Sequence, residues 1–523
     1  MADTTLKPSV ILVADRTLSS PYKVLFEGIF ATMQTTQVPE WAMKGLVSPT
    51  MAVDREGWAS AAPIGLRRIE AALIDQGVLS EREVVCTTPE GLARLMGPWV
   101  KVVGVSSSDP LGRGMSNTTT QHFWKGDLYT KVWTDRMMDY LAAAKAKYGF
   151  RIVGAGAGAW QWAFDRQAAE RQGIDVIFEG FGESAGVKLI GDLLEGKVVA
   201  GLVEETGTAE AQIPAIKRPS LLGIVELSRG CGRGCRFCTM SAKPMAHLPP
   251  DTILSDIETN VAGGVTSVVS GSEDFFRYGA SGPRVDFEKL CSLLHEMKRI
   301  ENLSFMQIDH ANVSSVLQLS DGELKEIRSL LHWKEHTDYL WVNMGVESAN
   351  GALVAANSTG KFAPFRADDW EEMVRDAVQR LNRTGFFPVL SIILGLPGET
   401  GEDVAKTLAL VEELAADRVV VFPIFYEPVR TGEQAFTLEE MRRDHLELYA
   451  ACYEINFRWV PPMFWDNQRA GGVSWSKRAL MRVLGKTEIR SWRKTFARMR
   501  QSLPDHESVT ALQEMQRVAG KGS

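Results

Sequence analysis

The stretch Glu226-Leu-Ser-Arg-Gly-Cys231-Gly-Arg-Gly-Cys235-Arg-Phe-Cys238 places three of the six cysteines of this 523-residue chain on one short loop. Thiolates are soft ligands that suit zinc or iron–sulfur clusters. A tetrahedral zinc site needs a fourth protein ligand, and no second cysteine pair follows the loop. Three thiolates on a glycine-rich loop can instead hold three irons of a [4Fe–4S] cube and leave the fourth iron open for a small ligand. A zinc knuckle and a chance grouping remain the alternatives.

The loop stands at the start of a series of alternating strand and helix patterns. Short apolar runs that predict strands are separated by segments whose apolar residues recur with the helical period. Six such units in series predict a partial (β/α)6 barrel, with function at the carboxyl ends of its strands. The predicted strands are 222–227, 266–270, 303–308, 340–345, 387–394 and 418–424.

The N-terminal part of the chain shows the same alternation. The runs 101–110, 151–160 and 174–183 each predict a buried strand that ends in small or polar residues. Such alternation predicts a doubly wound parallel sheet, in which ligands bind at the carboxyl ends of strands. The expected fold class is therefore α/β, in three parts: a doubly wound, Rossmann-like domain (1–215), the partial barrel (216–428) and a mostly helical C-terminal domain (429–523).

Composition narrows the possible functions. A content of 45% hydrophobic and 24% charged residues is that of a globular protein, which excludes a disordered chain or a fibre. The net charge of −7 disfavours a protein that grips nucleic-acid phosphates, so no nucleic-acid partner is expected. No signal-peptide core and no bilayer-length apolar run is present, so we expect a cytoplasmic protein without membrane contact. The scattered Cys86, Cys291 and Cys452 are expected to be buried apolar side chains.

The pattern Cys-x3-Cys-x-aromatic-Cys after the first strand of a six-unit array resembles the signature of the radical S-adenosylmethionine (SAM) enzymes. In that family SAM chelates the open iron, so the resemblance implies a [4Fe–4S] cluster on Cys231, Cys235 and Cys238. Three later strand ends resemble family segments that contact SAM: Ser270-Gly-Ser-Glu273-Asp274, Gly345-Val-Glu347-Ser348 and Gly395-Leu-Pro-Gly398-Glu399-Thr400. The resemblance implies SAM contacts by Phe237, Glu273, Asp274, Glu347, Ser348 and Leu396. Whether Glu273 or Asp274 meets the SAM amino group stays open.

The N-terminal domain is similar to the cobalamin-binding domain that precedes the barrel in one radical SAM subgroup. Small residues at 154–159 would let the backbone approach the corrin or its nucleotide tail. The Asp-x-His-x-x-Gly motif of many cobalamin proteins is absent, so no histidine is expected below the cobalt, and residues 15–18 or 106–109 would face it. A flavodoxin-like domain with another ligand, or with none, is the alternative. The implied cobalamin contacts are Ser106, Ser107, Ser108, Asp109, Gly154, Gly156, Gly158, Gly180, Gly182 and Glu183.

These resemblances imply a cobalamin-dependent radical SAM C-methyltransferase that acts on an unactivated sp3 carbon through a 5′-deoxyadenosyl radical and methylcobalamin. The expected substrate is a protein or peptide residue, because residues 13–18 and the tryptophan-rich tail resemble archaeal enzymes that methylate a glutamine of methyl-coenzyme M reductase. His310 and Tyr426 are the candidate substrate contacts, and an external one-electron reductant of ferredoxin or flavodoxin type is expected. Two alternatives stay open: rearrangement or cyclisation of a small molecule or tetrapyrrole, and a non-catalytic iron–sulfur electron carrier.

Overall fold

The computed structural model describes residues 6–205, 209–332, 337–429 and 431–502. The chain forms two compact units, and each is assembled from several stretches of sequence. Unit 1 consists of Met1–Asn117, Gly126–Leu227 and Ala246–Gly271; unit 2 consists of Thr118–Lys125, Ser228–Met245 and Ser272–Ser523. Within the described ranges, no helix is long and apolar enough to cross a membrane.

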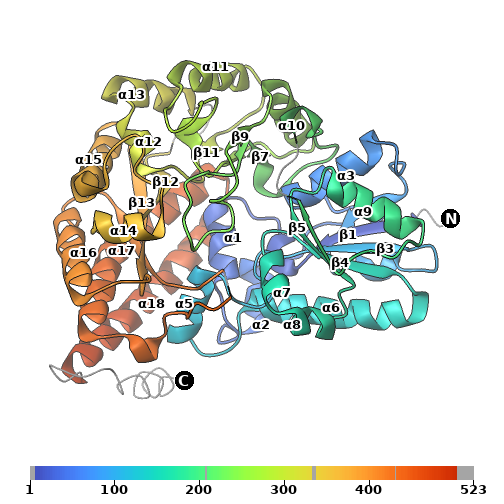
Figure 1. Ribbon diagram of the computed structural model, residues 1–523, viewed down its shortest axis with the longest axis horizontal. Helices are drawn as coiled ribbons and strands as arrows, with labels where there is room; N and C mark the ends of the chain where they lie inside the picture. The colour runs from blue at the N-terminus through green and yellow to red at the C-terminus, as the bar shows by residue number, and fades with distance from the viewer. Residues whose placement is uncertain (1–5, 206–208, 333–336, 430, 503–523) are drawn as a thin grey trace. The chain divides into compact units, whose positions relative to one another are not determined.

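A six-stranded parallel sheet of order β2-β1-β3-β4-β5-β6 forms the centre of unit 1 (Figure 1). The order reverses between β1 and β3, so the carboxyl ends of these two strands form the switch point at which doubly wound sheets bind ligands. The sequence patterns had marked β3, β4 and β5 but not the other three strands. The bounds are β1 Val10–Ala14, β2 Val84–Thr87, β3 Val102–Ser106, β4 Arg151–Ala155, β5 Val176–Gly180 and β6 Leu202–Glu205.

Both faces of this sheet are buried by helices, which confirms the predicted doubly wound architecture. Side chains alternate along a strand, so Ile11 and Val13 of β1 join one apolar cluster while Val10 and Leu12 join the other. The helices of this region are α1 Leu25–Thr32, α2 Glu40–Ala42, α3 Ile64–Asp75, α4 Leu92–Leu95, α5 Met115–Phe123, α6 Tyr129–Tyr148, α7 Ala159–Phe164, α8 Arg166–Arg171 and α9 Ala185–Leu194.

Unit 1 also contains the first two strands of the second β/α series. Strands β7 (Ile224–Glu226) and β10 (Val268–Gly271) pair in parallel, and α10 (Pro250–Ala262) lies between them in sequence. The buried Arg68 of α3 donates to Glu226 at 2.8 Å and to Asp256 of α10 at 3.0 Å. A charged network therefore ties the N-terminal sheet's helix layer to the strand that leads into the cysteines. The short strands β8 (Ser228–Arg229) and β9 (Ala246–His247) flank the cysteine-containing stretch.

Unit 2 continues the series with the parallel strands β12, β13 and β14. All six predicted strands of the series are present in the expected order, although the third, β11, is only two residues long. The predicted capping box of Ser320 and Glu323 opens α13, and Thr400 caps α16. The bounds are β11 Met306–Gln307, β12 Leu340–Glu347, β13 Phe386–Leu394, β14 Val420–Phe425, α11 Phe287–Lys298, α12 Val313–Leu317, α13 Asp321–Leu330, α14 Gly351–Asn357, α15 Trp370–Arg383 and α16 Gly401–Leu414.

The C-terminal part is helical, as predicted, and consists of α17 (Arg443–Ala470) and α18 (Trp475–Ser502). These helices pack together with α5 through an aromatic cluster. The ring of Phe123 in α5 lies 4.6 Å from that of Tyr449 in α17, and Phe496 in α18 lies 5.5 Å from Tyr453. A segment from the N-terminal third of the chain thus helps to form the core of unit 2.

Candidate functional site

The cysteine loop, residues 230–238, owes its tight shape to three glycines at alternate positions. Gly230, Gly232 and Gly234 have φ values of +71°, +69° and +69°, which side-chain-bearing residues rarely adopt. A Cβ on Gly230 would lie 2.3 Å from the Pro244 carbonyl oxygen, and one on Gly234 would lie 2.5 Å from the Thr359 hydroxyl oxygen. These glycines are therefore required by the turns and by close approach of the neighbouring chain.

The loop is held in place by the segment 357–361, which follows α14. The Arg236 amide donates to the Asn357 carbonyl at 2.9 Å, and the Gly360 amide donates to the Arg233 carbonyl at 2.8 Å. The Ser358 hydroxyl lies 3.0 Å from the Cys235 sulfur. Sequence reasoning did not identify this segment, because pairing between stretches more than a hundred residues apart leaves no local pattern.

The three cysteines form no disulfide, and Cys235 interacts electrostatically with both Cys231 and Cys238. Burial, with a smaller contribution from Cys235, raises the pKa of Cys231 and of Cys238 to about 11. The Arg233 guanidinium acts in the opposite direction and lowers the pKa of Cys231. Thiols in this state bind iron with release of their protons, so cluster binding would be favoured by alkaline pH.

Within the described ranges, no group of three or more His, Cys, Asp or Glu side chains is arranged to hold one metal ion. The three thiolates of a [4Fe–4S] cube bind different irons, so they stand farther apart than the ligands of one ion. The other three cysteines are buried at separate positions, as expected for structural residues.

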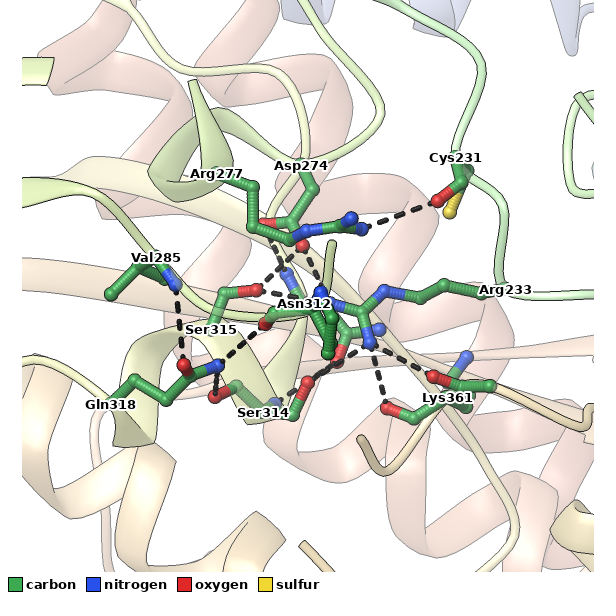
Figure 2. Close-up of polar contacts among 12 residues, drawn as sticks. Cys231, Arg233, Asp274, Arg277, Val285, Asn312, Ser314, Ser315, Gln318 and Lys361 are labelled. Atoms are coloured by element: carbon green, nitrogen blue, oxygen red, sulfur yellow. Dashed lines mark hydrogen bonds and ion pairs between the residues drawn. The ribbon is translucent and has the colours of Figure 1, made fainter. Parts of the chain in front are cut away.

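Asp274 and Glu273, which follow β10, have different environments (Figure 2 shows Asp274). The Asp274 carboxylate is fully buried and accepts from Arg233 at 2.9 Å and from the Ser315 hydroxyl at 2.6 Å. Its other oxygen accepts from the Asn312 amide at 3.2 Å. Both oxygens are thus occupied by the protein. The Glu273 carboxylate has no hydrogen-bond partner among the described residues, so Glu273 is the carboxylate that remains for a ligand.

His310 is the charged neighbour of Glu273. Its Nδ1 lies 3.0 Å from the Asp309 carboxylate. The side chain of His310 is 48% exposed, and the surrounding chain desolvates the rest, which would lower its pKa; Asp309 and then Glu273 outweigh that effect and raise the pKa to about 9. Burial raises the pKa of Glu273, whereas the positive charge of His310 opposes this. An imidazolium beside a partly desolvated carboxylate is an arrangement that can bind a zwitterionic ligand.

Glu347 and Lys361 form a buried ion pair at the end of β12. Glu347 has a φ of +64°, a strained conformation for a residue with a side chain. Burial would lower the pKa of Lys361, but Glu347, and more weakly the thiolates of Cys235 and Cys231, raise it. The Lys361 ammonium thus faces both the predicted SAM contact Glu347 and the cysteines.

The remaining predicted SAM contacts are Phe237, Ser348 and Leu396, and all three are buried. Ser348 follows Glu347, and its hydroxyl lies 3.2 Å from the Thr407 hydroxyl of α16, so this side chain is used by the protein. Leu396 and Phe237 are apolar and buried. Asn357, in the segment 357–361 that holds the loop, donates to the carbonyl of Pro397 at 3.0 Å and thereby connects the turn of Leu396 to the loop.

The second candidate substrate contact, Tyr426, is buried just after β14. Its hydroxyl donates to Glu433, and Glu433 also accepts from Arg236 of the cysteine loop at 2.7 Å. Tyr426 is therefore connected to the cysteine loop through the Glu433 carboxylate. His310 instead interacts electrostatically with Glu273.

The predicted cobalamin contacts gather at the carboxyl edge of the sheet in unit 1. The Ser107 hydroxyl, after β3, donates to the Asp15 carboxylate, after β1, at 3.1 Å. Burial raises the pKa of Asp15 to about 6. The Asp109 carboxylate accepts from the Gly114 amide at 2.9 Å and from Gln161 at 2.6 Å, so it organises the adjacent loop.

At the glycines of this edge, neighbouring parts of the chain approach so closely that a side chain would not fit. A Cβ on Gly156 would lie 2.5 Å from the Ser106 hydroxyl oxygen, and one on Gly158 would lie 2.4 Å from Pro110. Gly180 has a φ of +127°, and a Cβ there would lie 2.0 Å from the Glu205 carbonyl oxygen. Neighbouring parts of the chain therefore occupy the space that a side chain at these positions would need. Gly154, Gly182 and the buried Glu183 likewise lie in close-packed surroundings.

Residues 225–411 match the family model described as the Radical SAM superfamily, so the chain contains a radical SAM domain. One curated relative is the tRNA-2-methylthio-N(6)-dimethylallyladenosine synthase of Syntrophomonas wolfei, 24% identical over 308 residues, which cover 57% of this chain and 64% of the relative. Another is the ribosomal protein uS12 methylthiotransferase RimO of Leptospira biflexa, 26% identical over 240 residues, 42% of this chain and 45% of the relative. The chain thus spans about half to two thirds of such relatives.

Two solved structures share the fold. Both are of the radical SAM methyltransferase TsrM from Kitasatospora setae, one with tryptophan and a SAM analogue bound, the other with cobalamin and a [4Fe–4S] cluster bound. Each match covers 80% of this chain and 75% of TsrM at 15% identity, with TM-scores of 0.53 and 0.51. The likeness extends well beyond residues 225–411 and confirms the predicted fold class. A radical SAM domain implies a [4Fe–4S] cluster and SAM.

Proposed function

We propose, from the premise that residues 225–411 form a radical SAM domain, that this protein is a cobalamin-dependent radical SAM C-methyltransferase. The observation that carries the proposal is the combination of a three-cysteine loop with a preceding six-stranded doubly wound sheet, in a chain whose fold is similar to that of TsrM over 80% of its length. The cluster with SAM would supply a radical that abstracts hydrogen, and cobalamin would supply a transferable methyl group.

The protein's residues have binding and positioning roles in this proposal. Cys231, Cys235 and Cys238 would hold three irons of the cluster. Glu273 would accept from the amino group of SAM, because its carboxylate has no hydrogen-bond partner among the described residues. The carboxyl ends of β1 and β3, at Asp15 and Ser107, would face the cobalamin, because the strand order of the sheet reverses there.

The substrate that we propose is a protein or peptide residue, with a glutamine of methyl-coenzyme M reductase as the first candidate. His310 and Tyr426 are the proposed substrate contacts. The names of the curated relatives describe methylthiolation of a tRNA base and of a ribosomal protein, so macromolecular substrates occur among them. A one-electron reductant of ferredoxin or flavodoxin type completes the proposal. We also propose a cytoplasmic location, because the six cysteines are unpaired and reduced thiols persist in that compartment.

The test is anaerobic reconstitution of the full chain with iron, sulfide and methylcobalamin, followed by incubation with SAM labelled in its methyl group and candidate glutamine peptides. We expect 5′-deoxyadenosine and a peptide in which a methyl group, labelled after the first turnover, has replaced one hydrogen. Addition of a methyl group together with sulfur would instead establish methylthiotransfer. An isomerised or cyclised product without added mass would establish the rearrangement alternative, and absence of SAM cleavage under strong reductant would leave an electron carrier.

The matched controls use cysteines of the same chain. Replacing Cys235 by Ala should abolish 5′-deoxyadenosine formation, because the cluster would lose one of three protein ligands. Replacing the buried Cys291 of α11 by Ala should leave it intact, since that cysteine lies outside the loop. Equal loss of SAM cleavage in both variants would contradict the assignment of the loop.

A further inference from the structure

We infer that Arg233 is a positioning residue that holds the cysteine loop in its cluster-binding shape, and that Asp274 anchors this arginine instead of binding SAM. The inference rests on the proposed function, because it assigns to the loop the cluster proposed above. Arg233 lies midway between Cys231 and Cys235, so any movement of its backbone moves both sulfurs.

The contacts of Arg233 connect the loop to three separate segments of unit 2 (Figure 2). One terminal nitrogen donates to the Asp274 carboxylate at 2.9 Å and to the Ser315 hydroxyl at 3.1 Å. The other donates to the Ser314 hydroxyl at 3.0 Å and to the Gly360 carbonyl oxygen at 3.1 Å. Asp274 follows β10, Ser314 and Ser315 lie in the first turn of α12, and Gly360 lies in the segment 357–361. A planar guanidinium can bind all of them at once, which a lysine ammonium could not.

Asp274 is itself held in one orientation by other hydrogen bonds. Asp274 also accepts from Ser315 and from the Asn312 amide, so the carboxylate is oriented before Arg233 reaches it. Arg277, three residues later, donates to the Cys231 carbonyl at 3.2 Å and gives the loop a second attachment on the same side (Figure 2). Hydrogen bonds to the residues around metal ligands orient those ligands, and their loss commonly lowers metal affinity.

The buried charges around the cysteine loop, and two buried N–H donors without partners, also support a cluster beside Arg233. Arg233, Arg277 and Lys361 are buried cations, whereas the buried anions that they contact are Asp274 and Glu347. Arg277 donates to the carbonyl oxygens of Cys231 and Gly282 and to no carboxylate among the described residues, and a cube ligated by three thiolates carries net negative charge that would balance this cation. Moreover, the Nε atoms of Arg233 and Arg277 are buried without hydrogen-bond partners among the described residues. An acceptor such as a sulfide of the cluster would satisfy them.

The experiment compares the full-length Arg233→Gln variant with Arg236→Gln, a control on the same loop whose arginine is half-exposed and pairs with Glu433. Both are reconstituted anaerobically, and bound iron and sulfide, the EPR spectrum and the midpoint potential of the cluster are measured. We expect an about 10-fold or greater loss of cluster affinity in Arg233→Gln, the usual effect of removing a residue that orients metal ligands, and none in Arg236→Gln. Arg233→Lys keeps the charge, so its residual cluster should keep a potential near that of the wild type, whereas that of Arg233→Gln should become more negative.

Two further variants keep the test decisive if Arg233→Gln misfolds. Asp274→Asn should lose cluster affinity to the same extent as Arg233→Gln, and the double variant should be no worse than either single one, because both act through one contact. Far-UV circular dichroism of the apo-proteins verifies folding. Wild-type cluster content in Arg233→Gln, or additive losses in the double variant, would overturn the inference while leaving the proposed function intact. Failure of the wild type to bind a cluster would overturn both.

Discussion

The Ser107 hydroxyl donates to the buried Asp15 carboxylate at 3.1 Å and thereby joins the carboxyl ends of β3 and β1. The strand order of the six-stranded sheet reverses between these two strands. The sequence analysis had named residues 15–18 and 106–109 as the positions that would face a cobalt ion. In the structure a hydrogen bond connects these two groups, so the switch point of the sheet is a preorganised polar site.

Asp15 should make stability depend on pH. Its pKa is raised by burial from 3.8 to about 6, so between these values the folded state binds more protons than the unfolded state. Stability should therefore fall by about 2 kcal/mol as the pH rises from 4 to 6, within a total of about 3 kcal/mol over the whole titration, and stay lower above that. Asp15→Asn, which mimics the protonated form, should lack this contribution and be the more stable protein at pH 7. Denaturant unfolding from pH 4 to pH 8 measures both, and parallel curves would contradict the assignment.

Lys361→Met should destabilise the protein strongly, because it leaves the buried Glu347 carboxylate without its counter-charge. Breaking a buried ion pair from one side costs about 3–5 kcal/mol. The double variant Lys361→Met with Glu347→Gln should recover a large part of this loss, since no isolated charge remains. Chemical unfolding of apo-protein measures the three free energies. A double variant as unstable as the single one would show that packing, and not charge, explains the effect.

Gly230→Ala should prevent cluster binding, because its Cβ would collide with the Pro244 carbonyl oxygen at 2.3 Å and the loop would have to shift. Gly264, with a φ of +84° and no atom within 4 Å of its hypothetical Cβ, is the matched control. Gly264→Ala carries only the backbone strain, about 1–3 kcal/mol, and should keep the cluster. Iron content after reconstitution distinguishes the two variants. Equal cluster occupancy would mean that the approach to Pro244 does not define the loop.

Glu273→Gln should weaken SAM binding without loss of iron. A hydrogen bond to a charged group contributes about 1.5–3 kcal/mol, so we expect an affinity lower by about 10-fold or more. Equilibrium dialysis with reconstituted protein measures SAM affinity, and iron analysis of the same samples provides the control. Asp274→Asn should show the reverse pattern, with iron lost. If Glu273→Gln bound SAM normally, the carboxylate would have another task.

Phe496→Ala should loosen α18. This ring is buried and packs on Tyr449, Tyr453, Phe457 and Trp492. Removing a buried phenylalanine costs about 3–5 kcal/mol, and the loss falls on the contact between α17 and α18. Hydrogen exchange should show reduced protection in α18, whereas Leu484→Ala, at a position 46% exposed on the same helix, should leave it unchanged. Unchanged protection in Phe496→Ala would mean that other contacts hold the helix.

The strands that sequence patterns predicted best are the long apolar ones. Strand β13 was expected over 387–394 and spans Phe386–Leu394, because nine consecutive residues that suit a buried parallel strand have no competing helical period. Strand β11 was expected over 303–308 and spans only Met306–Gln307. Its short length depends on the neighbouring backbone, which local sequence does not encode. Strands β2 and β6 are four residues long and lacked a distinct pattern.

Only those residues of the candidate site whose role follows from their spacing in the sequence could be predicted. The three cysteines could be identified because their ligand role depends on local spacing. The separate roles of Asp274 and Glu273 could not, because the difference is the bond between Asp274 and Arg233, 41 residues apart in the sequence. Lys361 was missed for the same reason, since a lone lysine in a polar stretch carries no signal until its partner Glu347 is located.

The interleaving of the two units along the chain has a consequence for biosynthesis. Residues 118–125 leave the ribosome early, yet Phe123 packs on Tyr449, which is made more than three hundred residues later. Conversely, unit 1 requires β10 and is incomplete until Gly271 has been synthesised. A ribosome-bound nascent chain therefore carries an unburied aromatic segment through most of translation. Neither unit can be obtained by cutting the chain once, so truncated versions should aggregate or require chaperones.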